Sequence, residues 1–150
     1  MMCRELRAER TRILLVEDNP IDARVALQAL DGLTRPHEVE HVTDGSEALP
    51  ALDRATAAGT THDLILLDLN ASGVRGLDIL QAITTSSEYR HIPVVILTTS
   101  DHQPDIDAAA QHDARAYFVK PRSRDDWTEI LDALDAIVAD STPPSPRADL

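Results

Sequence analysis

Apolar residues along the chain fall into five short runs, separated by segments with helical periodicity. The runs occupy residues 13–16, 39–42, 64–67, 94–97 and 116–119. The first, third and fourth are almost continuously aliphatic, which is typical of strands that are buried on both faces of a parallel sheet. The second alternates with charged and polar residues, so we expect it at an edge of the sheet.

The segments between and after these runs predict five helices. They are expected at residues 20–30, 45–58, 76–84, 103–111 and 125–139. Asn19 followed by Pro20 supplies a capping side chain and a proline at the first helical position. Because strands and helices alternate strictly, the sequence predicts right-handed crossovers and an α/β fold, a doubly wound five-stranded parallel sheet with helices on both faces.

Length and composition indicate one domain. The chain has 150 residues, of which 43% are hydrophobic and 27% charged. We expect a folded unit at residues 11–139, a flexible N-terminus at 1–10 and a disordered C-terminal tail at 140–150, where three prolines occur. No apolar stretch is long enough for a membrane helix and the first residues do not form a signal peptide, so we expect a cytoplasmic protein.

Charge narrows the range of partners. With 26 acidic residues against 14 basic ones, the net charge is −12, and we expect no binding to nucleic acid. The basic residues are 13 arginines and one lysine, Lys120. Because an ammonium group is a compact point charge and a guanidinium a broad planar fork, this exception points to a place where only an ammonium fits.

Acidic residues follow two of the aliphatic runs. Glu17 and Asp18 come directly after the first run, and Asp68 follows the third. If these strands are neighbours, three carboxylates share one pocket at the carboxyl edge of the sheet, which is unfavourable unless a cation lies among them. Oxygen ligands favour magnesium. Acidic residues also end strands as solvated turn formers, so the carboxylates alone leave both interpretations open.

Two more polar side chains are expected at the same edge. Thr98 follows the fourth run, and Lys120 follows the fifth. A metal, a carboxylate nucleophile, a hydroxyl donor and an ammonium group together could hold a phosphoryl group. Taken singly, Thr98 is an ordinary strand residue. Tyr117, which lies in the fifth run, is by itself an ordinary half-buried aromatic.

Together these motifs resemble the receiver domains of two-component response regulators, over about residues 11–139. Residues 14–19 resemble the family's acidic pair, residues 66–68 its phosphoacceptor, and residues 117–121 its aromatic switch and lysine. Thr98 lies 30 residues after Asp68, and Lys120 lies 22 after Thr98, as in the family. The resemblance implies a stand-alone, CheY-like receiver with a flavodoxin-like fold and the strand order 2-1-3-4-5.

The resemblance also implies roles for individual residues. Asp68 would accept a phosphoryl group from a sensor histidine kinase, with Mg²⁺ held by Asp18, Asp68 and the backbone carbonyl of Asn70, and by Glu17 through water. Thr98 and Lys120 would bind the phosphoryl oxygens, and Thr98 with Tyr117 would form the switch. The chain would not be an enzyme beyond its own phosphorylation and dephosphorylation, and its output would be protein contact.

Residues 68–70 and 97–100 look most like the small regulators that are partnered with phytochrome-type kinases. The last predicted helix carries a long apolar stripe, which either packs on its own sheet or forms a homodimer. The stripe consists of Trp127, Ile130, Leu134, Ile137 and Val138.

Three other functions fit parts of the sequence. Residues 37–41 spell HExxH, which on a helix would make a zinc hydrolase with Glu38 as base, but the flanking Pro36 and the alternation favour a strand. His62 would be a possible third ligand. An aspartate-nucleophile phosphohydrolase needs a second aspartate where Asn70 stands. A receiver that docks without phosphorylation is disfavoured by the complete set of site residues.

Overall fold

A single parallel sheet with the strand order β2-β1-β3-β4-β5 forms the centre of the computed structural model, which describes residues 10–70 and 75–141. The strands are β1 (Thr11–Val16), β2 (His37–Val42), β3 (Leu64–Leu67), β4 (Val94–Thr98) and β5 (Ala116–Val119). All five predicted strands are present, and the polar second run lies at an edge. β1 begins two residues before the predicted run, because Thr11 pairs with His37 and its N–H donates to the Pro36 carbonyl at 2.9 Å, and β2 covers the residues 37–41 for which the alternation favours a strand.

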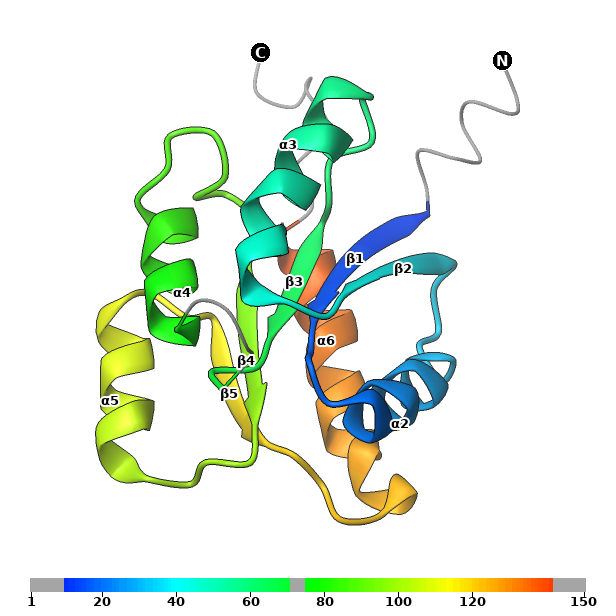
Figure 1. Ribbon diagram of the computed structural model, residues 1–150. Helices are drawn as coiled ribbons and strands as arrows, with labels where there is room; N and C mark the ends of the chain where they lie inside the picture. The colour runs from blue at the N-terminus through cyan, green and yellow to red at the C-terminus, as the bar shows by residue number, and fades with distance from the viewer. Residues whose placement is uncertain (1–9, 71–74, 142–150) are drawn as a thin grey trace.

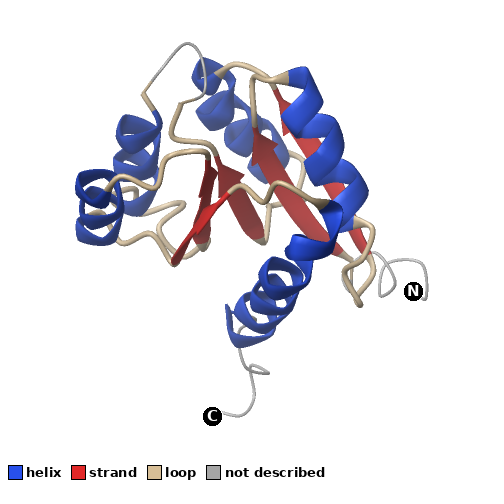
Figure 2. Ribbon diagram, turned by 90° about the horizontal axis from the view of Figure 1, so that it is seen from below, coloured by secondary structure: helices blue, strands red, loops and turns tan. Residues whose placement is uncertain are grey.

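Helices cover both faces of this sheet (Figures 1 and 2). One face carries α2 (Pro20–Leu30) and α6 (Thr128–Ser141), and the other carries α3 (Ala48–Ala57), α4 (Gly76–Thr84) and α5 (Gln103–Gln111). Successive residues of β1 point to opposite faces, so that Ile13 packs in the core under α2 and α6 and Leu14 in the core on the other side. The central strands are therefore buried on both faces, as their aliphatic sequences predict.

The third helix begins later than predicted. Residues Gly45–Glu47 form a 3-10 turn capped by Asp44, and the α-helix starts at Ala48. Pro50 explains the difference, because a proline inside the helix has no N–H for the carbonyl four residues earlier and its ring would clash with that carbonyl. Starting at Ala48 places Pro50 in the first turn, where no such bond is needed.

The boundaries of the folded unit also differ slightly from the prediction. A 3-10 turn at Arg124–Trp127 precedes α6, which continues to Ser141, so two residues assigned to the C-terminal tail are helical. Arg10, assigned to the flexible N-terminus, pairs with Glu38 at 3.4 Å. The remaining parts of both predicted tails, residues 1–9 and 142–150, lie outside the described residues.

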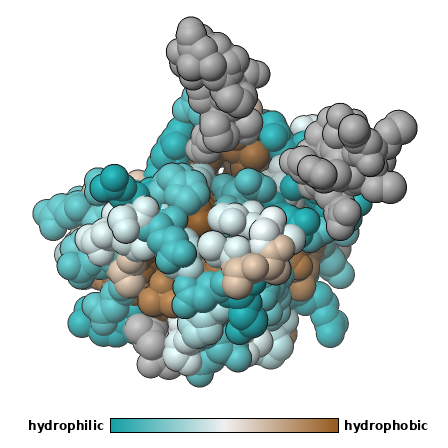
Figure 3. Space-filling model, turned by 90° about the horizontal axis from the view of Figure 1, so that it is seen from above, coloured by the Kyte–Doolittle hydropathy of each residue, from teal (hydrophilic) through white to brown (hydrophobic). Residues whose placement is uncertain are grey.

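The apolar stripe of the last helix packs on its own sheet. Its five side chains are buried against the face that also carries α2: Trp127, Ile130, Leu134, Ile137 and Val138. They are therefore not exposed for a second copy of the chain, and the stripe does not support the predicted homodimer. Within the described ranges, no helix is both long and apolar enough to cross a membrane. The face shown in Figure 3 is mostly hydrophilic.

Gly76 begins α4 at a point where the chain folds back closely on itself. Its N–H donates to the Leu69 carbonyl at 3.1 Å. A Cβ atom added at Gly76 would meet Leu69 Cα and would lie 2.7 Å from the Leu69 carbonyl oxygen. Both are backbone atoms that cannot turn away, so this position requires glycine.

We predict that Gly76→Ala lowers the free energy of unfolding by about 1–3 kcal/mol, because the new methyl group forces a backbone shift. The measurement is urea denaturation followed by circular dichroism. Gly32→Ala is the matched control, since its Cβ would meet the end of a flexible side chain, Leu131 Cδ1 at 2.9 Å, and should cost less. Equal stability losses in the two variants would contradict the explanation.

Candidate functional site

The candidate site lies where the carboxyl ends of β1 and β3 meet. The order of the strands along the chain reverses here, because β1 pairs with β2 on one side and with β3 on the other. Glu17 N–H donates to the Val42 carbonyl and Asp68 N–H to the Val16 carbonyl, both at 3.1 Å. The ladder therefore continues one residue past the strands and places Glu17 and Asp68 side by side at an edge where ligands bind in such sheets.

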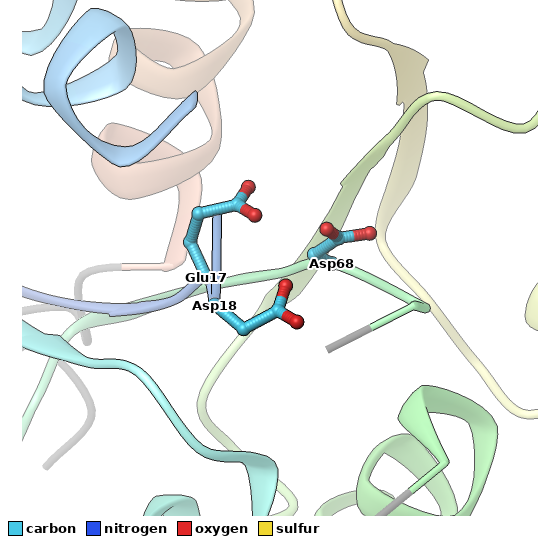
Figure 4. Close-up of side chains that lie close together, drawn as sticks. All are labelled: Glu17, Asp18 and Asp68. Carbon is cyan, nitrogen blue, oxygen red and sulfur yellow. The ribbon is translucent and has the colours of Figure 1, made fainter. Parts of the chain in front are cut away.

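Three carboxylates converge at this edge. Glu17 and Asp18 come from the end of β1 and Asp68 from the end of β3 (Figure 4). One oxygen atom of each lies within 4.8 Å of the others, and Glu17 and Asp68 are only 2% and 5% exposed. Within the described ranges, these residues are the one group of histidine, cysteine, aspartate and glutamate side chains close enough to hold a metal ion.

Lys120 supplies positive charge to the same place. Its ammonium Nζ lies 2.7 Å from Glu17 Oε1, 3.0 Å from Asp68 Oδ2 and 2.9 Å from Asp22 Oδ2. The backbone fixes the residue too, since Lys120 N–H donates to the Thr98 carbonyl at 2.7 Å. The single lysine of the chain therefore supplies the positive charge of the acidic cluster. Its compact ammonium group fits between the carboxylates, as the sequence suggested.

Burial and charge separate the pKa values of the two buried acids. Burial raises the pKa of Glu17 to about 7, which the hydrogen bond from Lys120 only partly offsets. Burial alone would also raise the pKa of Asp68, but hydrogen bonds from the Asn70 N–H and from Lys120 outweigh it and hold that pKa below its usual value. Asp68 is therefore a carboxylate at neutral pH, while the pKa of Glu17 lies close to neutrality.

Asn70 links Asp68 to Thr98. Its backbone N–H donates to Asp68 Oδ1 at 3.0 Å, and its side-chain amide donates to Thr98 Oγ1 at 3.3 Å. The Ser100 N–H also points at Thr98 Oγ1, at 3.5 Å. Thr98 is fully buried, and both contacts use its oxygen as an acceptor, so its own proton is left to donate to an oxygen atom bound at the site.

Tyr117 lies next to this group on β5. Its side chain is half-buried, and its hydroxyl donates to the Ser100 carbonyl at 2.8 Å. Ser100 Oγ in turn donates to Asp105 Oδ2 of α5 at 2.6 Å. Ser100 therefore joins the strand that carries Thr98 to both Tyr117 and α5.

Two contributors to the site had not been expected from the sequence. Asp22 contacts Lys120 from the first turn of α2, and His41, at the end of β2, donates its Nε2–H to the Glu17 carbonyl at 2.8 Å. Asp22 carries no distinctive signal, because acidic residues are common in the first turn of any helix. His41 was considered only as part of the HExxH motif.

The zinc interpretation of that motif is wrong. Residues 37–41 belong to strand β2, not to a helix. The ring of His37 bonds the Arg35 carbonyl through Nδ1 at 2.9 Å, and the ring of His41 bonds the Glu17 carbonyl. Glu38 pairs with Arg12, and the proposed third ligand, His62, bonds Glu40 Oε1 at 2.9 Å. A carbonyl accepts only from a protonated ring nitrogen, so neither bonded nitrogen offers a lone pair to a metal.

The acidic cluster itself suits a hard divalent cation. It offers carboxylate oxygens, no sulfur or nitrogen ligand, and negative charge that a single ammonium does not balance. A buried carboxylate beside a cation, a hydroxyl and an ammonium can attack phosphorus and hold the transferred group.

Comparison with known proteins agrees with this chemistry. The family model described as response regulator receiver domain matches residues 13–132. The probable methanogenesis regulatory protein FilR2 of Methanothrix harundinacea is 36% identical over 123 residues, which cover 81% of this chain and 79% of that protein. Response regulator Rcp1 of Synechocystis is 32% identical over 126 residues, which cover 83% of this chain and 86% of Rcp1.

Solved structures show the same likeness. The phosphorylated cyanobacterial phytochrome response regulator RcpA superposes with a TM-score of 0.78 and 34% identity, covering 91% of this chain and 99% of that one. The Mn²⁺-bound form of Rcp1 gives a TM-score of 0.72 and 31% identity, covering 84% of this chain and 92% of that one.

Metal binding at the site should weaken as the pH falls through about 7. Below this value Glu17 holds its proton, and a neutral carboxyl group attracts a cation less than a carboxylate does. We expect the affinity for Mg²⁺ to fall between about pH 8 and pH 6, and Mg²⁺ binding near pH 7 to release protons. Calorimetric titration in buffers of different ionisation enthalpy measures both quantities.

Glu17→Gln is the control, because an amide of the same shape does not titrate. The variant should bind Mg²⁺ more weakly than the wild type at pH 8 and show little change in affinity down to pH 6. A wild-type affinity that stays constant over this range would contradict the prediction.

Proposed function

The chain belongs to the response regulator receiver domain family and is a two-component response regulator, and from this premise we propose that Asp68 is its phosphoacceptor. The observation that carries the proposal is the setting of Asp68. It is a buried carboxylate at the end of β3, with Lys120 at 3.0 Å and the cation-binding oxygens of Glu17 and Asp18 beside it. Its low pKa keeps it charged, as a nucleophile must be.

The proposed resident metal is Mg²⁺, which neutralises charge on the phosphoryl oxygens when bound. Asp18, Asp68 and the backbone carbonyl of Asn70 would hold it, and Glu17 would hold one of its waters. The all-oxygen character of the cluster supports this choice. Receiver relatives bind divalent cations at least in one case, since Rcp1 has been solved with Mn²⁺.

In the proposed step, an oxygen of Asp68 attacks the phosphorus of a phosphohistidine on a sensor histidine kinase. An O–P bond forms, the P–N bond breaks, and its electron pair returns to the imidazole. Lys120 and Thr98 would donate hydrogen bonds to the transferred oxygens. This role is supported by the contact of Lys120 with Asp68 and by the link from Thr98 through Asn70 to Asp68. The chain thereby acts as an acceptor of the group rather than as an enzyme with a separate substrate.

Thr98 and Tyr117 would read the phosphorylation state. A phosphoryl oxygen that draws the Thr98 hydroxyl toward Asp68 would pull on Ser100, which holds the Tyr117 hydroxyl and Asp105 of α5. Of the nine residues of α5, all of them described, only Ala109 is buried. A helix with so small an anchor can move at low cost in free energy, so we place the output surface around α5 and β5.

The proposed input is a phytochrome-type histidine kinase. The likeness to RcpA, a phytochrome response regulator, supports this assignment. Homodimerisation stays a prediction without support from the apolar stripe of α6, and its measurement is the molar mass in solution.

We predict that incubation with acetyl phosphate adds one phosphoryl group to the wild type in the presence of Mg²⁺ and none after chelation. Asp68→Asn should gain no mass, because an amide is not a nucleophile toward phosphorus. Intact-mass spectrometry measures all three samples.

Asp63→Asn is a matched control outside the site, since the Asp63 carboxylate caps the Arg12 N–H at the start of β1, and it should be phosphorylated as the wild type is. If the wild type gains no mass, beryllofluoride separates rapid hydrolysis from a receiver that only docks. A conformational response detected by tryptophan fluorescence or NMR would keep the mechanism, and no response would replace it with docking alone.

A further inference from the structure

Asp22 contacts the site without belonging to its cation-binding group. The Lys120 ammonium has three hydrogens and three carboxylate partners: Glu17, Asp68 and Asp22, at 2.7, 3.0 and 2.9 Å. Glu17 and Asp68 share the cation-binding cluster with Asp18, whereas Asp22 is not part of it. Of the three carboxylates that contact Lys120, Asp22 is thus the one that would neither bind the cation nor accept the phosphoryl group.

The backbone of Asp22 is held in place by the cap of α2. Asp22 is the third residue of the helix, and its N–H donates to Asn19 Oδ1 at 3.0 Å, next to the Ile21 N–H at 2.9 Å. The positive end of the helix dipole favours a carboxylate at this position. Its side chain is 35% exposed, compared with 11% for Lys120, so Asp22 approaches the ammonium from the solvent side.

The other two partners of Lys120 are drawn elsewhere during the reaction. Glu17 and Asp68 would both turn toward a bound divalent cation, and in the proposed transfer one Asp68 oxygen would become part of an acyl phosphate. Lys120 must then exchange its Asp68 contact for a phosphoryl oxygen. Asp22 can keep its contact throughout, because neither the cation nor the phosphoryl group competes for it.

We propose that Asp22 is a positioning residue that holds the Lys120 ammonium beside Asp68 while the other contacts of that ammonium are exchanged. This inference rests on the proposed function. Asp22 acts only through Lys120 and touches no reacting atom. Its effect should therefore depend on whether residue 22 offers an acceptor for the ammonium.

Two variants with the same charge isolate this contact. Asp22→Asn and Asp22→Ala both remove one negative charge, but only asparagine keeps an oxygen that can accept from Lys120. We expect Asp22→Ala to slow phosphorylation by acetyl phosphate at saturating Mg²⁺ by about five- to tenfold, as loss of one charge-assisted hydrogen bond allows. Asp22→Asn should be at least about threefold faster than Asp22→Ala.

Asp78→Ala is the control for a change in the first turn of a helix. Asp78 is the third residue of α4, it is exposed, and it lies on the opposite face of the sheet from α2. This variant should be phosphorylated at the wild-type rate. Equal rates for Asp22→Ala and Asp22→Asn, or a rate for Asp22→Ala at or above the wild-type rate, would overturn the proposal.

A second measurement does not depend on phosphorylation. Lys120 is the single lysine of the sequence, so protein labelled with ¹⁵N-lysine carries one side-chain ammonium signal. An ammonium held by three carboxylates exchanges its protons with water slowly, and we expect this exchange to be several times faster in Asp22→Ala and intermediate in Asp22→Asn. Unchanged exchange in Asp22→Ala would overturn the proposal. If the wild type takes up no phosphoryl group, the proposed function fails, while the ammonium signal still decides whether Asp22 holds Lys120.

Discussion

Negative charge is concentrated at the carboxyl edge of the sheet, and the ammonium group of Lys120 stabilises it. Glu17 and Asp68 lose almost all contact with water, although two buried carboxylates repel each other. Lys120 contacts both, and it reaches them because β4 and β5 pair in a register that sets its backbone beside Thr98. The negative charge that Lys120 does not neutralise attracts a cation to this edge of the sheet. The same excess of negative charge therefore affects both metal binding and the stability of the fold.

The aliphatic strands were predictable because burial on both faces leaves few alternatives for such sequences. Their ends could be predicted too, since parallel strands place Glu17, Asp68, Thr98 and Lys120 at one edge whatever the detailed packing. Predicting where α3 starts requires both the capping sequence and Pro50 to be considered, because the proline shifts the start to Ala48. The contact of Asp22 with Lys120 could not be predicted. The sequence does not show whether an acidic side chain in the first turn of a helix faces water or an ammonium group.

The helices differ in how many side chains they bury against the sheet. α6 buries four aliphatic side chains, and Trp127 is buried in the turn just before it, whereas α5 buries one alanine. The stripe that suggested a dimer thus attaches the C-terminal helix to its own sheet. A change that began at Thr98, as proposed, would meet little buried packing in α5, where Ser100 connects the strand to Asp105.

Asn19 ties the geometry of the acidic pair to the direction of a helix. Its backbone N–H donates to Glu17 Oε2 at 3.3 Å, and its side chain caps Ile21 and Asp22. One residue therefore connects the side chain of Glu17 to the start of α2, a helix of eleven residues. A change at Asn19 would therefore disturb the cap of α2 and the contact with Glu17 together.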